Sequence, residues 1–166
     1  MSANTNYILD RAVAEKKLRR MALEIWENNG DEKQVILAGV RESGSVVGRC
    51  IQEILEEISP LKTEFITITL DKRQPKEISL SRELDFNDKV VIVTDDVANS
   101  GRTLLYAIKP FLEFQPKKIQ TLVLVERTHT HFPVRPDYVG LSIATTLQEH
   151  IYVEVADGKV TGAYLK

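Results

Sequence analysis

Cysteine is almost absent from this chain of 166 residues, and Cys50 is the only one. No disulfide can form within the chain, and a reducing compartment is its simplest setting. The first ten residues, MSANTNYILD, contain no apolar stretch and are not expected to form a signal peptide. Apolar runs that approach the roughly 20 residues needed to span a bilayer are also missing. Together these absences predict a cytoplasmic protein.

An excess of positive charge is missing too. The chain has 22 Lys and Arg against 24 Asp and Glu, a formal net charge of −2. Non-specific nucleic-acid binding depends largely on Lys and Arg, so it is not expected to be the main activity. One basic cluster, Lys16, Lys17, Arg19 and Arg20, is interpreted as the solvated face of a helix. The length suits one domain with a core, so residues 1–166 are predicted to form a single domain.

Hydrophobic periodicity predicts helices that alternate with strands. Helices are expected over residues 8–28, 45–58 and 103–114, and strands over residues 35–40, 65–70, 90–94, 119–125, 138–143, 151–155 and 160–165. The weakly patterned stretch 71–88 is expected to be a mobile functional loop, and Asp157-Gly158 a hairpin turn. This order predicts an α/β fold with a mainly parallel sheet flanked by helices. Ligands should bind beyond the carboxyl ends of its strands, after Val40, Thr94 and Glu126.

The segment VIVTDDVANSGRT, residues 91–103, carries most of the chemical information. A buried strand brings Asp95 and Asp96 to the sheet edge, and a turn of small residues then opens a helix. Free backbone N–H groups at such a turn suit a phosphate, and Gly101 allows close approach. The carboxylates can accept hydrogen bonds from two sugar hydroxyls. An ordinary strand–helix turn explains each part alone, but the ordered string predicts a ribose phosphate site.

This string resembles the signature of type I phosphoribosyltransferases: an apolar strand, two acidic residues, three variable positions, Ser or Thr, Gly, any residue and Thr. From Ile8 to the end, the chain is similar to the bifunctional pyrimidine-operon regulator and uracil phosphoribosyltransferase (PyrR-like) family. Arg127-Thr128-His129 and the segment PVRPDYVG, residues 133–140, carry that similarity. The resemblance implies transfer of ribose 5-phosphate from phosphoribosyl pyrophosphate to a base, with Mg²⁺ as cofactor and uracil as the favoured acceptor.

The resemblance also implies roles for particular residues. Asp95 and Asp96 would be catalytic, holding the ribose hydroxyls and meeting Mg²⁺ through water. The rest of the phosphoribose site would be Val97, Ala98, Asn99, Ser100, Gly101, Arg102 and Thr103. The pyrophosphate site would be Arg41, Glu42, Ser43 and Gly44, with Lys72 or Arg73 reaching in from a closing loop. The base site would be Arg127, Thr128, His129 and Val139.

Some positions depart from the family pattern. Ser43 stands where the family has an Arg, the closing loop is shorter, and Thr128 and Thr130 replace a Gly and a basic residue. Purine 6-oxo transferases have an Asp at the position of Asn99 and a Lys at that of Glu126, so a purine acceptor is disfavoured.

Several alternatives to uracil transfer stay open. They are a 6-oxopurine transferase, a nucleotide-sensing regulator that binds leader RNA, and a degenerate phosphoribose-binding module. Relatives imply a homodimer or a larger homo-oligomer. The pair His129 and His131 lacks partners at metal-binding spacing and is not expected to bind a metal, and His150 belongs to no recognisable constellation.

Overall fold

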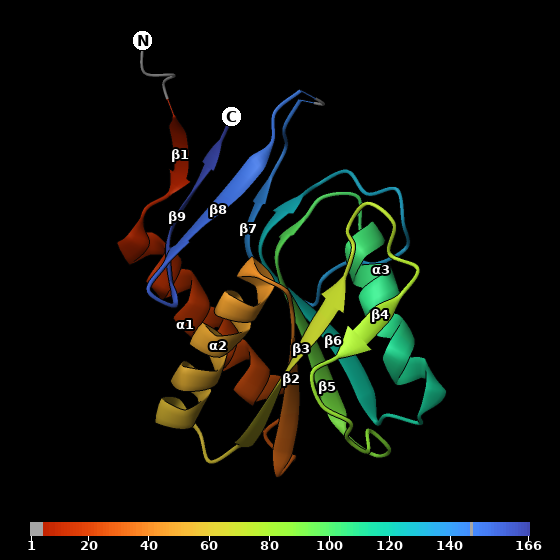
Figure 1. Cartoon of the computed structure of the whole chain (residues 1–166). Helices are drawn as coiled ribbons and strands as arrows, with labels where there is room; N and C mark the ends of the chain where they lie inside the picture. The colour runs from red at the N-terminus through yellow and green to blue at the C-terminus, as the bar shows by residue number, and fades with distance from the viewer. Residues whose placement is uncertain (1–4, 147) are drawn as a thin grey trace.

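Two sheets organise the computed structural model, which describes residues 5–146 and 148–166 (Figure 1). The larger sheet has the spatial order β4-β3-β2-β5-β6-β7. Its strands are β2 (Gln34–Val40), β3 (Lys62–Leu70), β4 (Ile78–Leu80), β5 (Val90–Ala98), β6 (Lys118–Arg127) and β7 (Tyr138–Ile143). Its neighbours pair in parallel except for β3 and β4. The mainly parallel sheet that the sequence predicts is therefore confirmed.

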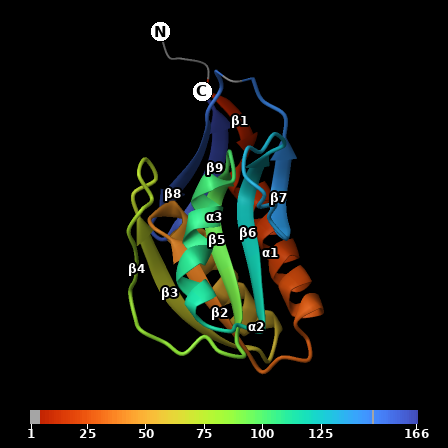
Figure 2. The ribbon, with the colours of Figure 1, turned by 90° about the vertical axis from the view of Figure 1, so that its right-hand side faces the viewer.

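The smaller sheet is antiparallel and joins the two ends of the chain. It consists of β1 (Asn6–Leu9), β8 (Ile151–Ala156) and β9 (Lys159–Leu165), in the order β1-β9-β8. It stands at the end of the molecule where the parallel strands finish, as Figures 1 and 2 show. Its inner residues Leu9, Val160 and Ala163 belong to the same buried cluster as the first two helices. Apolar packing therefore fixes the smaller sheet to the rest of the fold.

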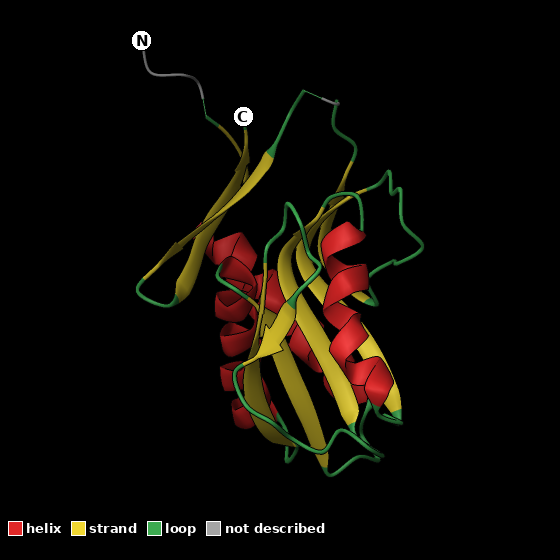
Figure 3. Ribbon diagram, turned by 45° about the vertical axis from the view of Figure 1, so that its right-hand side comes forward, coloured by secondary structure: helices red, strands yellow, loops and turns green. Residues whose placement is uncertain are grey.

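Helices cover both faces of the larger sheet (Figure 3). The helices α1 (Arg11–Asn28) and α2 (Ser43–Ile58) pack on one face, and α3 (Arg102–Ile108) with the 3-10 helix η1 (Lys109–Glu113) packs on the other. Along β2, Leu37 belongs to the first core cluster and Ile36 to the second. The continuous apolar run of this strand thus reflects burial on both faces. Among the residues described, no helix is both long enough and apolar enough to cross a membrane.

The start of the first helix differs from the prediction. The helix begins at Arg11, after Asp10, whose side chain accepts a hydrogen bond from the backbone N of Val13 at 2.8 Å. Ile8, expected inside the helix, lies in β1, which pairs with β9 at the other end of the chain. Local periodicity contains no information about so distant a partner.

Other predicted boundaries also shift. The stretch 71–88 is not all loop, because it contains β4, which pairs with the end of β3. Strand β5 runs on past Thr94 to Ala98, so both carboxylates lie within a strand that pairs with β6. The hairpin turn is confirmed, with positive φ at Asp157 (53°) and Gly158 (71°). Cys50, as expected, is buried.

Candidate active site

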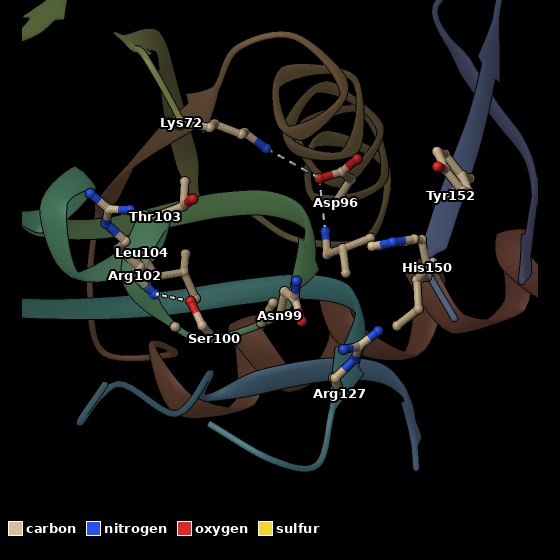
Figure 4. A pocket seen from close by; sticks show the side chains of 14 residues that line it. Lys72, Asp96, Asn99, Ser100, Arg102, Thr103, Leu104, Arg127, His150 and Tyr152 are labelled. Atoms are coloured by element: carbon tan, nitrogen blue, oxygen red, sulfur yellow. Dashed lines mark hydrogen bonds and ion pairs between the residues drawn. The ribbon is translucent and has the colours of Figure 1, made fainter. Parts of the chain in front are cut away.

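The two carboxylates near the end of β5 share one cation. Asp95 is only 1% exposed, and the side chain of Asp96 is 18% exposed. The Nζ of Lys72, just beyond β3, lies 3.4 Å from Asp95 Oδ1. The same Nζ lies 3.7 Å from Asp96 Oδ1, as Figure 4 shows. Asp95 Oδ1 also accepts a hydrogen bond from the backbone N of Asp96 at 2.8 Å. The other oxygen, Asp95 Oδ2, is buried without a hydrogen-bond partner.

This arrangement shifts the pKa values of Asp95 and Lys72. Burial and the neighbouring Asp96 raise the pKa of Asp95 well above its usual value, and Lys72 opposes that rise. Burial lowers the pKa of Lys72, but the attraction of the two carboxylates outweighs it and leaves that pKa raised. Lys72 therefore acts as the counter-charge of the pair.

The loop after β5 contains a glycine with positive φ and is held by hydrogen bonds at Ser100. Gly101 has a φ of 87°, a conformation that favours glycine. The carbonyl of Ser100 accepts hydrogen bonds from the backbone N of His131 at 2.9 Å and of Phe132 at 3.1 Å. Ser100 Oγ accepts one from the backbone N of Arg102 at 3.3 Å. Backbone hydrogen bonds from the segment that follows β6 thus hold this loop in place.

The loop after β2 meets the carboxylates through its glycine. A Cβ added to Gly44 would lie 2.9 Å from Asp95 Cα and 2.9 Å from the carbonyl oxygen of Thr94, so only glycine fits. Thr94 Oγ1 donates a hydrogen bond to the carbonyl of Gly44 at 2.8 Å. Arg41 and Glu42 are exposed, and the peptide bond between them is cis. Of the predicted pyrophosphate site, the structure brings Gly44 and Lys72 to the carboxylates.

A cavity of about 420 Å³ lies between Lys72, the loop after β5 and the smaller sheet (Figure 4). One wall is the unbroken run from Asp96 to Leu104, and Lys72 lies beside it. The opposite wall contains Arg127 from β6 together with His150, Ile151 and Tyr152. A pocket with a carboxylate, hydroxyls and backbone N–H groups on one side, and a mostly uncharged wall on the other, suits a phosphorylated sugar bonded to a flat group.

Comparison with known proteins decides the family. The family described as "Phosphoribosyl transferase domain" matches residues 4–157. The chain belongs to this family. "Bifunctional protein PyrR" from Streptococcus pneumoniae (strain CGSP14) is 32% identical to this phosphoribosyltransferase over 159 residues, which cover 92% of this chain and 91% of PyrR. The resemblance drawn from the sequence is therefore confirmed.

Solved structures confirm the type I phosphoribosyltransferase fold. A hypoxanthine-guanine phosphoribosyltransferase from Bacillus anthracis superposes with a TM-score of 0.76 at 17% identity, over 96% of this chain and 95% of that one. The hypoxanthine phosphoribosyltransferase of Trypanosoma cruzi gives 0.75 at 14% identity, over 84% and 82%. At these identities the likeness concerns the fold alone.

The predicted base site of this phosphoribosyltransferase is only partly gathered at the cavity. Arg127 lines it, whereas Thr128 and His129 are exposed outside its wall, and Val139 packs against the core cluster beneath α3. Arg73, predicted near pyrophosphate, is exposed, and its backbone N bonds to Asp71 Oδ1 at 2.8 Å. The roles of these residues stay predictions.

The smaller sheet supplies residues that the sequence did not reveal. His150, expected to belong to no constellation, lies in the cavity wall, and its backbone pairs with Lys166 in two hydrogen bonds of 2.8 and 3.0 Å. Tyr152 is 44% exposed and stacks on Tyr164, with ring centroids 5.3 Å apart and planes inclined by 19°. The sequence predicts a strand over residues 151–155, but nothing local could place it beside the phosphoribosyltransferase cavity.

Arg127 links the two sheets. Its Nη2 donates a hydrogen bond to the carbonyl of Glu149, just before β8, and its Nε is buried without a partner. Glu149 in turn accepts a hydrogen bond from the backbone N of Thr146 at 2.8 Å. Arg127 therefore holds the approach to the strand that carries Tyr152.

Proposed function

We propose that this phosphoribosyltransferase acts as a single domain that transfers ribose 5-phosphate from phosphoribosyl pyrophosphate to uracil, giving UMP and pyrophosphate. The observation that carries the proposal is that groups suited to a sugar and groups suited to a phosphate line one cavity. Acceptors for a sugar diol at Asp96 and donors for a phosphate at Ser100 to Thr103 line the same wall. A ribose phosphate is the ligand that uses both at once.

Each part of the wall has a task in binding. The backbone N–H groups of residues 99–103, with the hydroxyls of Ser100 and Thr103, hold the 5-phosphate. Asp95 and Asp96 accept hydrogen bonds from the two ribose hydroxyls. The backbone at Gly44 approaches pyrophosphate, and Arg41, Lys72 and Arg73 supply positive charge around it. These contacts fix the ribose so that its anomeric carbon faces the acceptor.

The carboxylates also fit Mg²⁺. This ion takes oxygen ligands and usually keeps waters and substrate phosphates in its coordination sphere. Within residues 5–146 and 148–166, no cluster of three or more His, Cys, Asp or Glu side chains forms a full set of ligands. Two carboxylates with one unpartnered buried oxygen suit a metal that arrives with pyrophosphate. When bound, Mg²⁺ would neutralise charge on the departing pyrophosphate.

Catalysis then rests on positioning and electrostatics. Positive charge develops on the ribose ring as pyrophosphate leaves, and the neighbouring carboxylates stabilise it. The wall from His150 to Tyr152 keeps water from the reacting carbon and orients the base. Arg127, Thr128, His129 and Val139 belong to the acceptor side in this proposal.

Uracil is favoured by two residues that differ from those of 6-oxopurine transferases. Asn99 cannot take or give the proton that a purine ring requires from an acidic residue at this position. Glu126 Oε1 accepts a hydrogen bond from Ser142 Oγ at 2.6 Å, so an acceptor stands where 6-oxopurine transferases have a cationic donor. A 6-oxopurine is the alternative acceptor that the assay must test.

RNA binding has less support than catalysis. Arg19 pairs with Glu57 at 3.4 Å, and Arg20 Nη2 donates hydrogen bonds of 2.9 Å to the carbonyls of Val139 and Gly140. Both arginines of the basic cluster thus already have partners within the protein.

Our proposal also includes a homodimer, which light scattering would test. It further includes a location in the cytoplasm, because reducing conditions suit the buried thiol of Cys50.

The direct test is turnover with phosphoribosyl pyrophosphate, Mg²⁺ and each of uracil, hypoxanthine, guanine, adenine and orotate. We expect pyrophosphate release with uracil and its loss when EDTA removes the metal. Release with hypoxanthine or guanine would overturn the interpretation of Asn99 and Glu126. If phosphoribosyl pyrophosphate binds but no base supports release, the protein is a nucleotide-binding module without transferase activity.

A further inference from the structure

Lys72 occupies the position that a substrate must reach. Its ammonium lies 3.4 Å from Asp95 Oδ1 and 3.7 Å from Asp96 Oδ1, close enough to pair with both carboxylates. In the part of the chain that the structure describes, Lys72 is the cation that forms ion pairs with them. The two adjacent carboxylates repel each other, and this cation offsets the repulsion.

Asp95 is buried, and its Oδ1 is paired with Lys72. Asp96 lines the cavity, but Asp95 does not, and only 1% of Asp95 is exposed. Asp95 Oδ2 is buried and has no hydrogen-bond partner. A ribose hydroxyl that enters the cavity therefore meets Asp96 first, and at Asp95 Oδ1 it must compete with the ammonium of Lys72.

We propose that Lys72 is a displaceable counter-ion, which covers the carboxylate pair until the ribose hydroxyls and Mg²⁺ replace it, and which then pairs with pyrophosphate. This inference rests on the proposed function. Uncharged hydroxyls cannot take over the charge of an ammonium, but Mg²⁺ can. Lys72 and Mg²⁺ thus compete for the same two carboxylates, and binding of the metal releases Lys72 toward the leaving group.

The surroundings of Lys72 permit this movement. Its side chain is 48% exposed, and its neighbours Asp71, Arg73 and Gln74 are exposed as well. The hydrogen bond between the backbone N of Arg73 and Asp71 Oδ1 lies within the same turn. A flexible four-carbon stem can therefore swing without disturbing either core cluster.

If Lys72 is displaced in this way, its removal should have opposite effects on ribose 5-phosphate and on phosphoribosyl pyrophosphate. Without the ammonium, Mg²⁺ and ribose 5-phosphate face no competitor and should bind more tightly. Phosphoribosyl pyrophosphate should lose a cationic partner, so turnover should fall. A residue that only contacted pyrophosphate would leave the affinity for ribose 5-phosphate unchanged, and a residue that only stabilised the fold would weaken both.

The first experiment compares the wild type with Lys72→Met and with Lys76→Met, an exposed lysine outside the cavity wall, by calorimetry with ribose 5-phosphate and Mg²⁺. We expect Lys72→Met to bind ribose 5-phosphate about tenfold more tightly, a gain of about 1.4 kcal/mol, while its turnover falls. Lys76→Met should match the wild type in both. Equal or weaker binding by Lys72→Met would overturn the inference.

The second experiment follows Lys72 in the wild type by acetylation and mass spectrometry. Ribose 5-phosphate with Mg²⁺ should speed acetylation of Lys72, and pyrophosphate added afterwards should slow it again. Unchanged acetylation, with ribose 5-phosphate bound, would overturn the displacement alone. Failure of the wild type to bind ribose 5-phosphate would instead overturn the proposed function, and this inference with it.

Discussion

At the phosphate end of the cavity an unbroken run from Asp96 to Leu104 forms the wall, whereas at the other end Arg127 comes from β6 and Tyr152 from the second sheet. The first wall is one strand, one turn and the start of one helix. The second exists only because β8 pairs with β9 and packs on the core beside the larger sheet. The phosphate end should therefore tolerate little change in sequence, and the acceptor end should depend on how the two sheets sit together.

The largest expected effect comes from the carboxylate pair at the start of the first wall. Asp95→Asn together with Asp96→Asn removes both negative charges that the ribose hydroxyls and Mg²⁺ need. We expect binding of phosphoribosyl pyrophosphate to be abolished in calorimetry. The control double variant, Asp31→Asn with Asp85→Asn, loses the same charge outside the cavity and should bind normally. Unchanged binding by the Asp95 and Asp96 variant would remove the central assignment.

A smaller loss is expected from Gly44→Ala. The new Cβ would lie 2.9 Å from Asp95 Cα and 2.9 Å from the carbonyl oxygen of Thr94, and because both are backbone atoms the backbone must shift. A displacement of about 1 Å in such a site costs about a hundredfold in rate, so turnover should fall by that factor. Gly30→Ala adds the same methyl where its nearest contact is the carbonyl of Trp26 at 3.3 Å, and its turnover should stay close to wild type. Equal turnover in the two variants would contradict the inference that turnover depends on the close contact between Gly44 and Asp95.

The contrast between the walls explains what the sequence could and could not predict. The string from Val91 to Thr103 is continuous in sequence, so the delivery of Asp95 and Asp96 by a strand, and the small-residue turn that opens α3, could be predicted. The strand β1 could not, because it pairs with β9 at the other end of the chain. The cavity position of His150 could not either, because it depends on how the smaller sheet packs beside the larger one. Lys72 was predicted near pyrophosphate, but its pairing with Asp95 requires β3 and β5 to lie on either side of β2.

Tyr152→Leu tests whether the second wall faces the base. Stacking of a base on an aromatic ring contributes about 1–3 kcal/mol, so we expect the KM for uracil to rise about tenfold while the KM for phosphoribosyl pyrophosphate stays unchanged. Tyr7→Leu is the matched control, because Tyr7 is also an exposed tyrosine in contact with Tyr164 but lies outside the cavity wall. A rise in both KM values, or the same change in the Tyr7 variant, would show that Tyr152 acts through the stability of the sheet.

The smallest expected effect on turnover comes from the packing of the second sheet. Val160 is 2% exposed in the cluster that joins β9 to α1 and α2, and Val160→Ala should lower the free energy of unfolding in urea by about 2 kcal/mol. The adjacent Lys159 pairs with Glu53 at the surface, and Lys159→Met should leave the urea midpoint unchanged.

Both variants should keep wild-type turnover at low temperature, because neither residue lines the cavity. A single urea transition in Val160→Ala would mean that the two sheets unfold together, and the acceptor wall is then as rigid as the phosphate wall. Two separate transitions would mean that the smaller sheet can detach. In that case the KM for uracil should rise on warming before the KM for phosphoribosyl pyrophosphate does, since only the acceptor end depends on that sheet.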